Sequence, residues 1–470
     1  MSDAESSQAA EHSSSQGSAS KTVPLPGRYW KLWSANFISN LGNGVSSVAM
    51  PWLASALTRS PLTIAIIGLM SQLPWLLFTL PAGVITDRFD RKKIIILTDL
   101  LRGIVTVIAS VVLYLNRASF THIKNPSEAF IGGSSLGLLL MIGASSFLLG
   151  AAEVLGNNAA QTFMPDVVEQ ELLEKANGQM WSAEYLTVAF IGPFLGSLLL
   201  GLSIYLPFFF DATSFFFSAG LIALIATQAR KMATSAERRA KASESNRSSR
   251  QQFSAELKEG FTWLMSHKVL RPLAFTLGSL NLTTNLAFAS FILYVQEVLR
   301  VSVFIFAVLG TAGAIGGMLG GWLGPKIIAK LGDGRTLTLA LIGYPTFFLL
   351  AFFVRNWYFF YAIAFLESLL SVLWNIVTVS FRQSVIPNEL LGRVNSGYRF
   401  FGWGSMPLGS FLGGAIVTVS AHFVSRSLAL RIPFLVSALL GLIVFAVTRS
   451  LFTSERLNEV RIAAGVAPRP

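Results

Sequence analysis

Long apolar runs recur along the whole chain, and they constrain its fold more than any other feature. Twelve of them are long enough to cross a bilayer, because about 20 helical residues at 1.5 Å each cover the ~30 Å hydrocarbon core. The chain is 53% hydrophobic and 13% charged, whereas soluble domains carry roughly 25% charged residues. We therefore expect an all-α membrane protein with twelve transmembrane helices, at residues 34–57, 61–84, 93–115, 132–157, 179–201, 206–228, 270–296, 303–323, 336–354, 357–379, 398–418 and 432–452.

The distribution of positive charge sets the expected orientation. With the N-terminus inside, most of the 36 Lys and Arg residues fall in cytoplasmic segments, as the positive-inside rule requires. The same bias explains the net charge of +12 without nucleic acid as a partner. We expect a multi-pass protein of the plasma (inner) membrane, surrounded by the lipid bilayer, with both termini in the cytoplasm.

One long polar segment divides the spans into two groups of six. Residues 229–268 combine Lys and Arg with Ser and Ala and predict a basic cytoplasmic linker; binding of anionic lipid or nucleic acid is the alternative to a solvated segment. The linker separates an N-terminal six-helix bundle, 30–228, from a C-terminal six-helix bundle, 269–452. Residues 1–29 lack an apolar core and predict a disordered cytoplasmic tail rather than a signal peptide. Residues 453–470 predict a second cytoplasmic tail.

A short charged loop joins the second and third spans, and residues 83–93 read GVITDRFDRKK. This pattern resembles the loop between the second and third helices of major facilitator superfamily transporters. The resemblance implies that Gly83 allows close helix approach and that Asp87 latches the two halves in the outward-facing state. Arg88, Arg91 and Lys92 complete the motif. The alternative is a plain positive-inside signal with no latch function.

The two halves also resemble each other in sequence. Residues 165–178 of the first half are similar to 387–397 of the second, and 193–197 to 407–410. Two parallel six-helix repeats are the major facilitator arrangement. The stretch 387–395, the pair Asp99 and Arg102, and Asp211 resemble the enterobactin-exporter-like and macrolide-efflux-like branch, which contains drug:proton antiporters.

Polar side chains follow one helical face of the spans that line the central cavity in the resembling family, namely the first, fourth, seventh and tenth. An unpaired polar group is costly inside the membrane, so such faces indicate a cavity or a helix contact. The expected cavity-lining residues are Asn36, Asn40, Asn43, Ser47, Asn157, Asn281, Asn285, Ser371 and Asn375. Hydrogen bonds that merely hold helices together are the alternative for each Asn and Ser.

Four charged residues are candidates for the proton or substrate pathway. Glu367 lies about ten residues, or ~15 Å, into the tenth span. A lone charge there is costly, so we expect Glu367 to be protonated part of the time or to meet a cationic substrate. Asp99 and Arg102 are spaced i, i+3 and can pair, and with Glu153 they could form a charge relay beneath the latch. Structural ion pairs are the alternative in each case.

One proline-containing segment is a candidate for helix bending. Gly192, Pro193 and Gly196 resemble the antiporter signature of drug exporters, although Val188 replaces the usual upstream glycine. Proline also bends many membrane helices that have no part in export. Glu184 and Asp211, nearer the ends of their spans, are expected to be anchors rather than carriers.

Several chemistries find no support in the sequence. The four His residues are scattered and there is no Cys, so no metal site and no cofactor is expected. No phosphate-binding glycine motif and no catalytic constellation is present, so an enzyme is not expected. The most favoured function is proton-coupled export of a small, largely apolar molecule (a drug-like compound or a siderophore) by a monomer. A lipid or lysolipid translocator, and a transport-inactive sensor or scaffold, are the alternatives.

Overall fold

The computed structural model describes residues 24–117, 136–169, 172–225 and 258–468, and in this part of the chain the regular structure is helical. Eleven helices among the described residues are long and apolar enough to cross a membrane. Helix α2 (Gly27–Leu57) has 31 residues and is also long enough, but its asparagine face makes it more polar than the others. The expected all-α fold with twelve transmembrane spans is confirmed.

The first group of helices contains spans one to six. After α2 come α3 (Pro61–Arg88), α4 (Arg91–Leu115), α5 (Leu136–Val167), α6 (Leu173–Tyr185), the π-helical turn η3 (Leu186–Ile191), α7 (Gly192–Leu202) and α8 (Leu206–Ala223). Polar caps define the short loop that carries the predicted motif. Asp90 Oδ1 accepts from the Lys93 amide at 3.2 Å and caps the start of α4, so that only two residues separate α3 from α4.

The second group contains spans seven to twelve and a C-terminal surface helix. Its helices are α11 (Leu270–Phe288), α12 (Phe291–Glu297), α13 (Val303–Leu331), α14 (Asp333–Phe353), α15 (Trp357–Val385), α16 (Asn388–Gly404), α17 (Met406–Ser420), α18 (Arg426–Ala429), α19 (Ile432–Thr448) and α20 (Ser454–Ala463). A short helix at 258–266, which we call the linker helix, precedes α11.

Three spans are interrupted along their length. Span five consists of α6, η3 and α7, span seven of α11 and α12, and span eleven of α16 and α17. Pro193 explains the first interruption and Pro407 the third, because proline has no N–H to donate to the preceding turn. The spans expected at 179–201, 270–296 and 398–418 are therefore present, each with an interruption in its helix.

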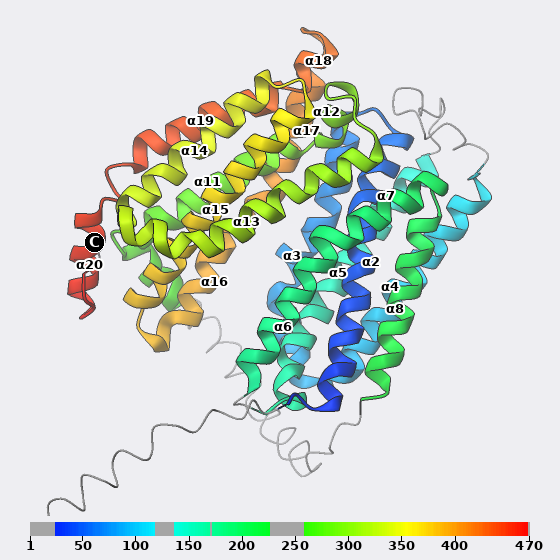
Figure 1. Ribbon diagram of the computed structural model, residues 1–470, viewed down its shortest axis with the longest axis horizontal. Coiled ribbons are helices and arrows are strands. Elements are labelled where there is room, and N and C mark those ends of the chain that lie inside the picture. The colour runs from blue at the N-terminus through cyan, green and yellow to red at the C-terminus, as the bar shows by residue number, and fades with distance from the viewer. Residues whose placement is uncertain (1–23, 118–135, 170–171, 226–257, 469–470) are drawn as a thin grey trace, which may run out of the picture.

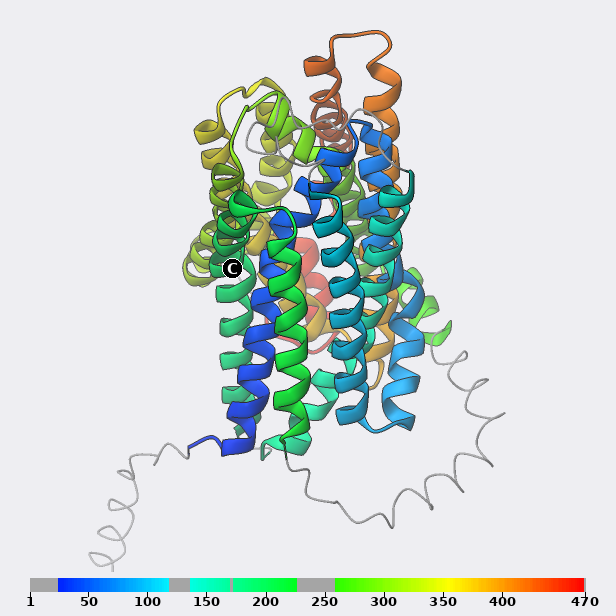
Figure 2. The ribbon, with the colours of Figure 1, turned by 90° about the vertical axis from the view of Figure 1, so that its right-hand side faces the viewer.

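The two groups meet at one end of the molecule and diverge toward the other (Figure 1). Between them, α3 packs on α17 and α7 packs on α13. Where they meet, Trp52 and Leu53 of α2 share an apolar cluster with Ile292 and Leu293 of α12 and Val417 of α17. We call this the joined end, and the end where α2 begins the open end. Within the first group, α2 and α8 run side by side (Figure 2).

Candidate functional site

A cavity of about 510 Å³ lies among α11, α14, α15 and α16, and we call it the second-half cavity. Four predicted site residues line it: Asn281, Glu367, Ser371 and Asn375. Asn281 Nδ2 donates to the Gly402 carbonyl at 2.9 Å, which joins α11 to α16. The polar faces predicted for spans seven and ten therefore meet at one cavity.

Glu367 is a half-buried carboxylate in this cavity. None of the hydrogen bonds and ion pairs found among the described residues involves its oxygens. Tyr344, across the cavity, is occupied elsewhere, because its hydroxyl donates to the Leu280 carbonyl and bonds to Thr284. A carboxylate inside a membrane span that has no hydrogen-bond or ion-pair partner can bind a proton or a ligand.

The same cavity holds two buried polar groups without a partner in the described part of the chain. They are the indole Nε1 of Trp374 and the hydroxyl of Tyr398. An unsatisfied buried donor costs roughly 1–3 kcal/mol. Neither residue was a sequence candidate, because a Trp or Tyr in an apolar span is more often core or interface anchor. Only the packing of α16 beside α11 and α15 shows that they face a cavity.

A second cavity of about 530 Å³ lies between the two groups of helices, and we call it the inter-half cavity. The first group contributes the polar residues Asn43, Ser47, Arg102, Glu153 and Asp211, and the second group contributes mainly apolar ones, including Phe288, Phe291, Ile292 and Phe306. The polar groups of this cavity therefore all come from the first group of helices, among apolar residues from both groups.

Hydrogen bonds connect the asparagine face of α2 to Arg102. Asn40 donates to Asn36, Asn43 Nδ2 donates to Asn40 Oδ1 at 3.3 Å, and an Arg102 NH2 group donates to Asn43 Oδ1 at 2.6 Å. Arg102 also lies 4.0 Å from the centre of the Phe215 ring. Of the predicted lining residues on α2, Asn43 and Ser47 line the cavity, and Asn36 and Asn40 act as supports for them.

Asp99 and Arg102 do not pair as the i, i+3 spacing suggested. Asp99 Oδ2 accepts from Ser218 at 2.6 Å, and Arg102 turns instead to Asn43. Glu153, expected beneath the latch, lines the inter-half cavity together with Asp211. Asp211 is 3% exposed and accepts from Ser46 at 2.5 Å. Sequence analysis treated Asp211 as an anchor, yet an acid inside an apolar span was the signal that could have marked it.

Two other predicted lining residues lie away from both cavities. Asn157 is exposed on α5. Asn285 Oδ1 accepts from Gln72 Nε2 at 3.3 Å, which links α3 to α11 across the two groups. Asn285 thus fits the alternative of a hydrogen bond that holds helices together.

The predicted latch motif is described in part. For Gly83, Asp87 and Arg88 the structure describes only the helical backbone. Arg91 donates to the Thr162 carbonyl at 2.8 Å and to Asp166 at 3.2 Å, and Lys92 Nζ donates to carbonyls at the end of α8. These contacts tie the start of α4 to α5 and α8, with cations placed at helix C-termini.

Gly192 and Gly196 allow α7 to approach α2 closely. A Cβ added to Gly192 would lie 2.5 Å from the Gly44 Cα, and one added to Gly196 would lie 2.6 Å from the Val45 carbonyl oxygen. Pro193 is the second residue of α7, which begins directly after the π-helical turn η3. The predicted helix-bending segment is therefore a change of helix type combined with a close helix contact.

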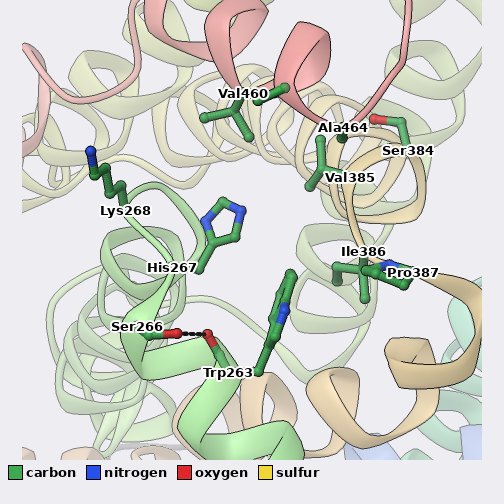
Figure 3. A pocket seen from close by; sticks show the side chains of 11 residues that line it. Trp263, Ser266, His267, Lys268, Ser384, Val385, Ile386, Pro387, Val460 and Ala464 are labelled. Carbon is green, nitrogen blue, oxygen red and sulfur yellow. Dashed lines mark hydrogen bonds between the residues drawn. The ribbon is translucent and has the colours of Figure 1, made fainter.

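A third cavity, of about 670 Å³, lies at the open end between the linker helix, the end of α15 and α20 (Figure 3). His267 and Trp263 face residues of α15 and α20 across it (Figure 3). Their polar neighbours are already paired: His267 Nδ1 accepts from the Val269 and Leu270 amides, and Ser266 donates to the Trp263 carbonyl. Burial lowers the pKa of His267 below its usual value, which keeps the ring neutral for this role. We interpret this cavity as a junction between surface segments.

Two ion-pair arrangements hold the ends of the molecule. At the joined end, Glu297 lies 3.0 Å from Arg426 Nε and 3.8 Å from an NH1 group of Arg59. Arg59 also donates to Gln296 at 2.6 Å, and Gln296 donates to Ser55 at 2.8 Å. We call these residues the joined-end network. At the other end, a buried pair of Arg461 and Asp333 attaches α20 to the start of α14.

The fold and the cavities can now be compared with known proteins. A family model described as "transmembrane secretion effector", of major facilitator type, matches residues 19–469. The chain belongs to this family. Major facilitator proteins of this family are transporters, in agreement with the expectation that the chain is not an enzyme.

The curated relatives of this family member match over a limited stretch. The multidrug efflux pump Tap of Mycobacterium tuberculosis is 28% identical over 169 residues, which is 35% of this chain and 36% of that protein. Tap of Mycolicibacterium fortuitum is 24% identical over 168 residues, or 35% and 37% of the two chains. The match thus covers about a third of the length of these relatives.

Solved structures support the fold of this family member over nearly its full length. A bacterial homologue of the iron transporter ferroportin, in an inward-facing state, has a TM-score of 0.68 at 15% identity, covering 91% of this chain and 99% of that one. The nucleoside transporter NupG has a TM-score of 0.60 at 12% identity, with 91% and 99% covered. At these identities the likeness concerns the fold.

Proposed function

We propose that this chain is a proton-coupled exporter of small, largely apolar molecules, and that Glu367 is the group that binds the coupling proton. The observation that carries the proposal is the position of Glu367: a half-buried carboxylate, deep in α15, in a cavity, with no partner among the described residues. Such a carboxylate gains from protonation or from a ligand. The likeness to multidrug efflux pumps supports the direction of transport.

The arrangement of the two groups of helices supports transport by alternating access. With both termini in the cytoplasm, as the positive charges favour, the joined end faces outward and the open end faces the cytoplasm. Cargo would load from the cytoplasm, and rocking of one group against the other would break the joined-end network and close the open end. Asp87, with Gly83, Arg88, Arg91 and Lys92, would hold the open end shut in that second state.

An efflux assay with one substitution tests the role of Glu367. In a pump-deficient host, a panel of fluorescent apolar dyes identifies one whose efflux needs both this protein and the proton gradient. For that dye, we expect Glu367→Gln in proteoliposomes to lower efflux driven by a pH gradient at least tenfold, because the amide cannot bind and release a proton.

The matched control is Glu459→Gln, which makes the same chemical change at an exposed position of α20. It should leave efflux as in the parent protein. Undiminished gradient-driven efflux by Glu367→Gln would contradict the proposal, and so would a parent protein whose efflux does not depend on the proton gradient.

A further inference from the structure

The lining of the second-half cavity contains more cationic and hydrogen-bond donor groups than acidic groups. Its lining contains Arg382 of α15, Arg399 of α16 and the single carboxylate Glu367. The inter-half cavity has the opposite balance, with Arg102 against Glu153 and Asp211. The two cavities therefore favour ligand groups of opposite charge.

Neither arginine of the second-half cavity is neutralised by an acid in the described part of the chain. Arg382 donates from Nε to the Thr378 carbonyl at 3.3 Å and from NH1 to Asn395 at 3.1 Å, and both partners are neutral. Its guanidinium lies 3.9 Å from the centre of the Tyr398 ring. These contacts fix the direction of Arg382 and leave its charge uncompensated. Arg399 is exposed and lies 5.4 Å from the centre of the Trp403 ring.

Two buried donors without partners belong to the same lining. Tyr398 is 2% exposed and Trp374 is 5% exposed, and neither the hydroxyl nor the indole Nε1 has a partner among the described residues. An indole N–H can only donate, so only an acceptor can satisfy it. Oxygens that carry negative charge are the strongest acceptors for such groups and for guanidinium.

We propose that Arg382, Arg399, Tyr398 and Trp374 form a binding site for an anionic oxygen group, a carboxylate or a phosphate, carried by the cargo. The cargo is thereby an organic acid whose apolar body packs against Leu277, Leu280 and Leu370 of the same cavity. This inference rests on the proposed transport function and adds the chemical class of the substrate.

A matched pair of probes tests the site on the full-length protein in nanodiscs of phosphatidylcholine. Pyrenebutanoate carries the carboxylate, and pyrenebutanol is its neutral counterpart with the same apolar body. We expect the parent protein to bind the acid about tenfold more tightly than the alcohol, measured by fluorescence anisotropy. Arg399→Gln should abolish this preference, and Tyr398→Phe, which removes one hydroxyl, should lower it about threefold.

A charge control separates a local site from general positive charge at the open end. Lys330→Gln removes an exposed cation from the last turn of α13, in the same half. This variant should keep the parent preference. Equal binding of the two probes by the parent, or an equal loss of preference in Lys330→Gln and Arg399→Gln, would overturn the proposal.

Two further experiments are needed. The first shows whether the anionic group belongs to a lipid or to the cargo, and the second distinguishes the anion-site proposal from the exporter proposal. If phosphatidylglycerol in the nanodisc binds through Arg399 and displaces pyrenebutanoate, the occupant is a lipid headgroup and the cargo assignment is wrong. If the parent protein binds pyrenebutanoate tenfold more tightly than pyrenebutanol but transports neither probe in proteoliposomes, the anion site stands and the exporter proposal is wrong. If the parent protein binds the two probes equally and transports them in response to the proton gradient, the anion site is wrong and the exporter proposal stands.

Discussion

Single residues decide how closely the helices of the first half approach. Gly44 of α2 faces Gly192 of α7 at a distance that leaves no room for a methyl group on either. In membranes, small residues at such contacts replace the hydrophobic effect as the source of helix association. The glycine beside Pro193 therefore has a packing role that is separate from any bending by the proline.

We expect Gly192→Ala to destabilise the protein by about 1–3 kcal/mol, because its Cβ would overlap the backbone of α2. Thermal unfolding in detergent should show a lowered midpoint. Gly201→Ala on the same helix is the control, since a Cβ there meets nothing within 4 Å. Equal midpoints for the two variants would show that the close contact adds no stability.

Sequence analysis singles out residues that are unusual by their own chemistry and misses those whose surroundings depend on packing. Glu367 was predicted to be a deep, unpaired group because an acid in a long apolar run is costly wherever it points. Trp374 and Tyr398 could not be found in this way, since aromatic residues are ordinary in membrane spans. Asp99 and Arg102 have the right spacing to pair, but helix spacing does not reveal that Ser218 and Asn43 compete as partners.

At the scale of elements, the membrane spans can be predicted from the length of the apolar runs. The interruptions within the spans cannot, because they depend on local hydrogen bonding. Twelve runs predicted twelve spans, and the two halves of the chain adopt similar arrangements. The breaks in spans five, seven and eleven interrupt the α-helical hydrogen-bond pattern, which is acceptable where protein or a cavity surrounds the backbone. The break between α11 and α12 places Phe291 and Ile292 on the inter-half cavity.

The joined-end network is an element-scale contact that should control opening. Glu297→Gln removes the charge between Arg59 and Arg426, and we expect roughly 1 kcal/mol of lost stabilisation, about a fivefold shift toward opening. The measurement is the rate at which a membrane-impermeant maleimide labels Ala56→Cys, which is 3% exposed at this end in the parent structure. The rate should rise about fivefold in the Glu297→Gln background.

Arg355→Gln is the control for that experiment. It removes a charge between α14 and α15 that takes part in none of the ion pairs found among the described residues. An equal labelling rate in both backgrounds would show that the network does not hold the joined end.

At the scale of the whole molecule, two helical groups that meet at one end and diverge toward the other (Figure 1) predict rocking motion. The chain has no cysteine, so introduced cysteines provide unique sites for spin labels. Phe89→Cys with Phe400→Cys reports on the open end, and Leu202→Cys with Phe423→Cys on the joined end, because all four residues are exposed and each pair joins the two groups.

We expect electron–electron distance measurements to change in opposite directions for the two pairs when a transported dye is added at low pH. The open-end distance should shorten and the joined-end distance should lengthen. A pair within the first group, Leu115→Cys with Leu202→Cys, should stay constant. Parallel changes in both pairs would contradict rocking of two groups.

The attachment of α20 has a practical consequence for such measurements. Because Arg461 and Asp333 join this helix to the start of α14, α20 moves with the second group of helices. A fluorescent label on α20 would then report the movement of that group, and energy transfer to a dye near the start of α2 would follow the transport cycle.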